Sequence, residues 1–149
     1  HSFGGRIAAY IASKQPPWLG KLVLYGAPLF YTPPFGVRVK SKIARMLKNV
    51  IPFKERILSI VVSEHRPDLY ETFKKAVVFD LAQQLPSINA PTLLVWGEHD
   101  REAPVSNAQR AEKMIKNSSM VLLPKQGHTI HIEAPYLFYG VVKKFIENC

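Results

Sequence analysis

Three short apolar runs constrain the fold of this 149-residue chain more than any other feature. They occupy residues 22–25, 91–97 and 119–124, and each run ends at a glycine or a proline. Continuous apolar runs of this length are typical of strands that are buried on both faces, as in a parallel sheet. Amphipathic helical patterns occupy residues 3–14, 104–116 and 134–147. This alternation predicts an α/β fold, a parallel sheet with flanking helices.

The segment between the first and second predicted strands has a different pattern. It begins with the proline- and glycine-rich stretch "FYTPPFG" and continues with helical stripes at 37–50, 53–63 and 67–79. No alternation typical of a strand interrupts them. We therefore predict an α-helical insertion at 30–88 in a core made of residues 1–29 and 89–149.

Positive charge is concentrated in this insertion. The chain carries a net charge of +9, and residues 36–62 hold seven lysines and arginines but one glutamate. Such a patch could contact nucleic acid, anionic lipid or an acidic substrate, although a solvated helix face is the simpler interpretation. Aromatic residues do not alternate with these bases as a base-stacking platform would require, so we predict no nucleic-acid partner. Peripheral membrane contact through the basic helix at 37–50 is kept as an alternative.

Two further features bear on the compartment. Cys149 is the one cysteine, which excludes a disulfide within the chain and favours a reducing, cytoplasmic setting. No apolar run approaches the roughly 20 residues that span a bilayer.

A serine opens the chain in the stretch "HSFGG". Ser2 comes just before a predicted helix and is followed by Gly4 and Gly5. Taken alone, it is interpreted as a helix-capping serine. The alternative is the second half of a G-x-S-x-G turn, in which glycines allow close approach of strand and helix and the serine is exposed.

Two other polar residues follow predicted strands. Asp100 in "WGEHDREAP" comes after the second strand, and His128 in "KQGHTIHIEAP" comes after the third. The carboxyl ends of parallel strands meet at one edge of the sheet, where open α/β folds place their sites. Asp100 alone could be a turn or capping residue. His128 and His131 alone could suggest a metal, but a third ligand is not evident, so no metal is predicted.

The order Ser2, Asp100, His128 joins these observations. It is the order of the α/β-hydrolase triad, and the sequence resembles that superfamily in three motifs. "HSFGG" resembles a nucleophile elbow without its first glycine. "WGEHDREAP" is similar to a W-G-x-x-D-x-x-x-P acid loop, and "GHTIHIEAP" to a G-H-x-x-x-x-E-x-P histidine loop. The insertion at 30–88 matches the position of the superfamily's helical cap.

The resemblance implies a mechanism and a site. Ser2 would be the nucleophile, His128 the general base and acid, and Asp100 the residue that orients His128. The backbone N–H of Phe3 would stabilise an oxyanion. Serine at this position distinguishes the chain from branches with an aspartate nucleophile. The implied activity is hydrolysis of a small ester or related acyl substrate through an acyl-enzyme, with no cofactor. The alternative is a non-catalytic binding module or an inactive remnant of the same fold.

The first predicted helix has no strand before it, and the resemblance covers only the C-terminal half of the fold. We therefore expect the chain to be a fragment that lacks the N-terminal half and one oxyanion donor. An unpaired apolar edge on its first strand would favour aggregation. Alone, the chain is expected to be poorly folded or inactive.

Overall fold

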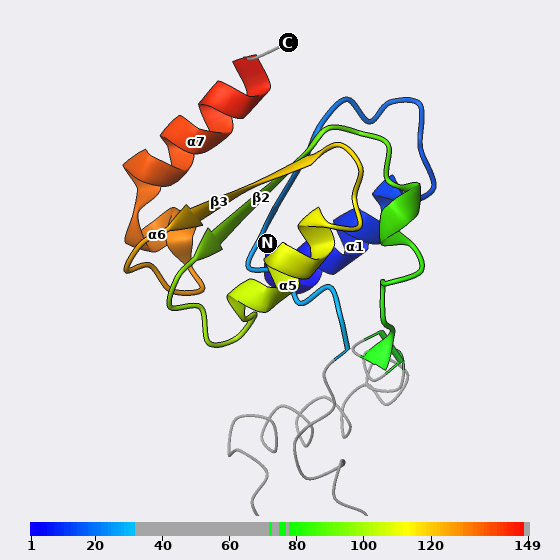
Figure 1. The fold of residues 1–149 in the computed structure, drawn as a ribbon, viewed down its shortest axis with the longest axis horizontal. Coiled ribbons are helices and arrows are strands. Elements are labelled where there is room, and N and C mark those ends of the chain that lie inside the picture. Colours follow the sequence, from blue (N-terminus) through cyan, green and yellow to red (C-terminus); the bar gives the residue numbers. More distant parts are fainter. Residues whose placement is uncertain (32–71, 73–74, 77, 148–149) are drawn as a thin grey trace, which may run out of the picture. The chain divides into compact units, whose positions relative to one another are not determined.

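The computed structural model describes residues 1–31, 72, 75–76 and 78–147 (Figure 1). Two compact units make up the chain. One contains residues 1–30 and 80–149, and the other contains residues 31–79. The helices predicted at 37–50 and 53–63, and the basic segment that includes them, lie outside the described residues. Their assignment to a helical cap stays a prediction.

A parallel sheet of three strands forms the centre of the first unit. Strands β1 (Leu22–Tyr25), β2 (Thr92–Gly97) and β3 (Ser118–Leu123) follow one another in the order β1-β2-β3. Both pairings are parallel, with Tyr25 opposite Val95 and Gly97 opposite Leu123. The predicted parallel sheet, and with it the α/β class, is confirmed.

Helices cover both faces of this sheet (Figure 1). Helices α1 (Ser2–Ala12) and α5 (Val105–Glu112) pack on one face, and α6 (Ile130–Glu133) and α7 (Pro135–Glu147) pack on the other. Every residue of β2 is buried, because the strand lies between two neighbours and two helical layers. Its side chains alternate, so Leu94 and Trp96 join the α1 and α5 side, whereas Leu93 and Val95 join the α6 and α7 side.

Strand β3 is less buried than its apolar sequence suggests. It pairs with β2 on one side, and no second neighbour of β3 occurs among the described residues. Most of its residues are therefore half-buried or exposed, and Leu122 keeps 44% of its surface exposed. An edge position explains the difference from the prediction of a strand buried on both faces.

The boundary of the core differs from the one predicted. Leu81, Leu85 and Ile88 are at most 1% exposed and pack in the same cluster as Leu24 of β1. Leu85 begins a short 3₁₀ helix, η3 (Leu85–Ser87). Residues 80–88 therefore belong to the core rather than to the insertion, whose unit is 31–79 instead of 30–88. The prediction included them in the insertion without assigning them an element, because the sequence does not show which surface buries their apolar side chains.

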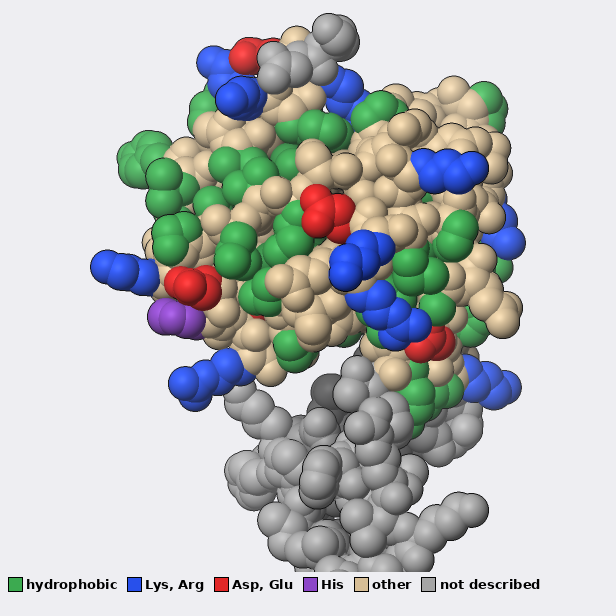
Figure 2. Space-filling model, viewed as in Figure 1, with side chains coloured by type: hydrophobic (Ala, Val, Ile, Leu, Met, Phe, Trp, Pro, Cys, Tyr) green, Lys and Arg blue, Asp and Glu red, His purple; other side chains and the backbone are tan. Residues whose placement is uncertain are grey.

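The outer surface of α6 and α7 is rich in apolar side chains (Figure 2). Ile132, Tyr136, Leu137 and Tyr139 are all more than half exposed. No residue of α7 is fully buried, although Phe138 and Phe145 pack partly against the sheet. An apolar surface of this kind is typical of an interaction surface. Within the described ranges, no helix has the length and apolar character needed to cross a membrane.

One pair of substitutions tests the assignment of core and edge. Leu94→Ala on β2 should lower the free energy of unfolding by about 2–5 kcal/mol, because it empties a fully buried position. Leu122→Ala removes the same atoms from the half-exposed edge strand and should cost about 1 kcal/mol or less. Chemical denaturation of the complete gene product measures both. Equal losses would contradict this arrangement of the strands.

Candidate active site

Ser2 is the first residue of α1 and has a left-handed backbone with φ of 47°. This region is costly for a residue with a side chain, by about 1–3 kcal/mol, and such residues cluster at functional sites. The serine does not cap its helix: the N-cap is His1, and no side-chain capping bond occurs there. Instead, Ser2 Oγ lies 3.2 Å from Nε2 of His128. The capping interpretation is therefore wrong.

Close packing near the elbow occurs at Gly5 rather than at Gly4. A Cβ atom on Gly5 would lie 2.7 Å from the Cβ of Ala27, in the loop after β1. A Cβ on Gly4 would meet no described atom within 4 Å. The second glycine of the pair thus lets α1 approach the sheet and sets the distance of Ser2 from its neighbours.

Asp100 lies in the turn after β2 and its side chain is completely buried. Its Oδ1 accepts hydrogen bonds from the backbone N–H groups of Glu102, at 2.9 Å, and Ala103, at 2.8 Å. Its Oδ2 lies 2.9 Å from Nδ1 of His128. These donors compensate the burial of the carboxylate charge. Asp100 is therefore a turn residue and a partner of His128 at once, and the two interpretations of its motif do not exclude one another.

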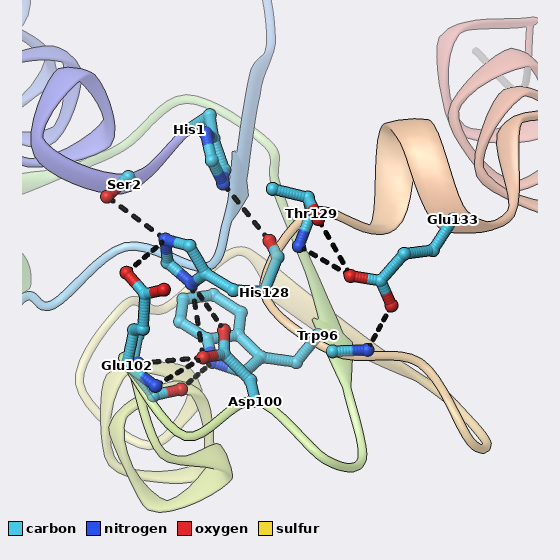
Figure 3. Close-up of polar contacts among 10 residues, drawn as sticks. His1, Ser2, Trp96, Asp100, Glu102, His128, Thr129 and Glu133 are labelled. Carbon is cyan, nitrogen blue, oxygen red and sulfur yellow. Dashed lines mark hydrogen bonds and ion pairs between the residues drawn. The ribbon is translucent and has the colours of Figure 1, made fainter.

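His128 joins the other two residues (Figure 3). A carboxylate only accepts hydrogen bonds, so we assign the ring proton to Nδ1, which faces Asp100. Nε2 then has a lone pair that can accept the hydroxyl hydrogen of Ser2. Three residues that are 28 to 126 positions apart in the sequence thus form one continuous chain of hydrogen bonds.

Trp96 supports the loop that carries Asp100. Its ring is fully buried, and Nε1 donates a 2.8 Å hydrogen bond to the carbonyl of Ala103. This bond holds the loop at the residue whose own N–H faces Asp100. The sequence motif included the tryptophan without a role. A buried indole needs a hydrogen-bond acceptor for its N–H, and this requirement was the signal that could have indicated a role for Trp96.

Glu133 supports the loop that carries His128 in the same way. Its carboxylate accepts hydrogen bonds from the backbone N–H groups of Gly127 and Thr129 and from the Thr129 hydroxyl. The bond from Gly127, followed by that from the Thr129 hydroxyl, holds the pKa of Glu133 below its ordinary value. Both residues that flank His128 are therefore fixed by one side chain (Figure 3). This glutamate was part of the histidine motif, but sequence reasoning assigned it no role.

His1 completes the surroundings of His128. Its Nε2 lies 3.1 Å from the carbonyl oxygen of His128, and its ring stacks on Tyr25 with 4.7 Å between centroids. His131 places the edge of its ring against His1 at 5.0 Å. Among the described residues, no group of three or more His, Cys, Asp or Glu side chains is arranged to hold a metal ion. Phe3 follows Ser2 in the first turn of α1, and its role as an oxyanion donor stays a prediction.

A parallel sheet with site residues in the order Ser2, Asp100, His128 is typical of the α/β-hydrolases. Comparisons with known proteins point to the same class. A family model of the α/β-hydrolases, described as TAP-like protein, matches residues 73–140. The solved structure of an α/β-hydrolase enzyme from a lagoon-sediment metagenome superposes with a TM-score of 0.71 at 21% identity, over 99% of this chain and 58% of the other. The chain has part of the α/β-hydrolase fold, and its sequence is similar to proteins of that superfamily.

Curated relatives agree with this assignment. The "Uncharacterized hydrolase YugF" of Bacillus subtilis is 29% identical over 99% of this chain and 63% of its own length. A 2-hydroxy-6-oxononadienedioate/2-hydroxy-6-oxononatrienedioate hydrolase of Pseudomonas putida is 27% identical over 99% of this chain and 61% of its own. The chain thus spans about three fifths of the length of these relatives.

Gly97 provides a test of how the two loops pack. A Cβ at this position would lie 2.2 Å from the carbonyl oxygen of Gly127, next to His128. Gly97→Ala should therefore displace the histidine loop and break the contact between His128 and Asp100. Gly140→Ala is the control, since its Cβ would meet no described atom within 4 Å and alanine favours the helix.

The ring-proton NMR signal of His128 Nδ1 measures the outcome, because a hydrogen bond to a carboxylate moves this signal downfield. We expect the signal in the wild type and in Gly140→Ala, and its loss in Gly97→Ala. An unchanged signal in Gly97→Ala would show that the loops do not pack in this way.

Glu133 provides a test with pH. A carboxyl group whose pKa is lowered in the folded protein stabilises it above the ordinary pKa, and this contribution is lost as the pH falls through the folded pKa. Glu133→Gln should therefore lower Tm at neutral pH, and its difference from the wild type should shrink below about pH 4. Glu112→Gln, an exposed glutamate at the end of α5, should show no such convergence. A difference that is constant across the pH range would contradict the role of the ionised carboxylate.

Proposed function

We propose that the complete gene product is a serine hydrolase that cleaves a small ester or related acyl substrate through an acyl-enzyme. One observation carries the proposal. Ser2 Oγ lies 3.2 Å from Nε2 of His128, while Nδ1 of the same ring lies 2.9 Å from the buried carboxylate of Asp100. This is the arrangement that activates a serine hydroxyl: a base within hydrogen-bond reach, oriented by a third group.

The first half-reaction forms the acyl-enzyme. Ser2 Oγ bonds to the carbonyl carbon of the substrate as its proton passes to Nε2 of His128. Asp100 stabilises the imidazolium through Nδ1. The bond to the leaving group then breaks, and Nε2 gives its proton to the departing atom. In the second half-reaction, water loses a proton to Nε2 of His128 and attacks the carbonyl carbon of the acyl-enzyme. The bond between that carbon and Ser2 Oγ then breaks, Ser2 Oγ takes the proton back from Nε2, and the acid is released.

The N-terminal turn of α1 supports the charged intermediate. Ser2 is the first residue of this helix, and the helix dipole favours negative charge at that end. Phe3 would contribute its backbone N–H to the oxyanion. Of the two curated relatives described above, one is named for particular substrates and the other for none, so the acyl group is proposed here only as a class.

Labelling by a fluorophosphonate probe tests the proposal, because the probe reacts covalently with activated serines. We expect the complete gene product to be labelled and Ser2→Ala to lose the label entirely. Ser106→Ala on α5 removes an exposed serine from the same unit and should keep full labelling. Absence of labelling in a folded wild-type protein would favour the alternative, a non-catalytic α/β-hydrolase-like module.

A further inference from the structure

A second carboxylate faces the reactive nitrogen of His128. Glu102 Oε2 lies 3.6 Å from Nε2, which is also the nitrogen that faces Ser2 (Figure 3). The backbone of Glu102 is fixed, because its N–H donates to Oδ1 of Asp100 at 2.9 Å. The turn that places Asp100 beneath the ring therefore also places Glu102 beside it, two residues further along.

The two carboxylates have opposite environments. The side chain of Asp100 is completely buried, and both of its oxygens receive hydrogen bonds. The side chain of Glu102 is 76% exposed, and Nε2 of a neutral His128 offers it a lone pair rather than a proton. Asp100 therefore has its charge compensated within the site. The charge of Glu102 is directed at the space that a substrate must enter.

The geometry limits how far a leaving group can lie from this charge. In the proposed mechanism, the departing atom must come within about 3.2 Å of Nε2 to receive its proton. Because Nε2 is 3.6 Å from Glu102 Oε2, that atom lies no more than about 7 Å from the carboxylate. A charged group a few bonds beyond the departing atom can come closer still.

We propose that Glu102 makes this site select acyl substrates with a positively charged leaving group. This inference rests on the proposed function, and it names the substrate class of the same site. A cation next to Glu102 is attracted in both the bound state and the transition state, whereas an anion is repelled. The carboxylate is exposed, so water and salt weaken the effect, and we expect a preference of about 3- to 10-fold.

Two thioesters of the same shape measure this preference. Acetylthiocholine has a quaternary ammonium group in its leaving group, and 3,3-dimethylbutyl thioacetate has a neutral carbon in its place. The kcat/KM ratio of the pair is compared among the wild-type gene product, Glu102→Gln, and Glu147→Gln. Glu147, the last residue of α7, is an exposed glutamate paired with Lys143 and serves as the matched loss of charge.

The wild type and Glu147→Gln should favour the cationic thioester by about 3- to 10-fold at low ionic strength, and added salt should reduce this ratio. Glu102→Gln should bring the ratio to about one. The inference is overturned if Glu102→Gln slows both thioesters equally, or if the ratio is the same in all three proteins. A ratio that does not respond to salt in the wild type would also overturn it.

If neither thioester is cleaved, the same comparison uses covalent labelling of Ser2 by a cationic phosphonate and its neutral isostere. Faster labelling by the cation that depends on Glu102 supports the inference. Labelling of Ser2 without charge preference overturns this inference but leaves the proposed function intact. Absence of labelling by both probes overturns the proposed function and this inference with it.

Discussion

The parallel pairing of β1, β2 and β3 determines where the site forms. Parallel strands bring their carboxyl ends to one edge, so the loops that carry Asp100 and His128 leave the sheet side by side. The pairing continues past the strands: the N–H of Glu98 donates to the carbonyl of Leu123, and that of His99 to the carbonyl of Gln126. A slip of one residue would reverse every side chain of β2 and separate Asp100 from His128.

Three carboxylates surround His128, and their environments give each a different task. Asp100 is buried and hydrogen-bonded, so it can hold the ring through Nδ1 without loss of its charge. Glu133 contacts the backbone on both sides of the histidine and fixes the loop rather than the ring. Glu102 is exposed and faces Nε2. The same functional group thus serves orientation, support and, in our proposal, selection. Burial distinguishes Asp100, whereas Glu133 and Glu102 are both exposed and differ in that Glu133 accepts hydrogen bonds from the loop backbone.

The sequence predicted the sheet from local signals, and it named Ser2, Asp100 and His128 as candidates from their order and their resemblance to three motifs. Apolar runs mark β1 and β2, and a polar residue after a strand marks an edge of the sheet. It was harder to predict which residues belong to the core and which strand lies at the edge of the sheet. Leu81 and Ile88 belong to the core, and β3 is an edge strand, and both facts depend on contacts between distant segments. The roles of Trp96 and Glu133 were missed for a different reason. Each side chain bonds to a loop backbone group between 4 and 7 residues away in the sequence, and a residue pattern does not show such bonds.

Ser2 and His128 are positioned by independent parts of the fold. His128 and Asp100 depend on the register of β2 and β3 and on the loops that Glu133 and Trp96 support. Ser2 depends on how closely α1 lies against the loop after β1. The absence of a side chain at Gly5 and the single methyl group of Ala27 allow this close approach. The left-handed backbone of Ser2 costs free energy that no capping bond returns. In this conformation the Ser2 hydroxyl lies within hydrogen-bond distance of His128, so a strained residue occupies the position whose direction decides whether the three groups meet.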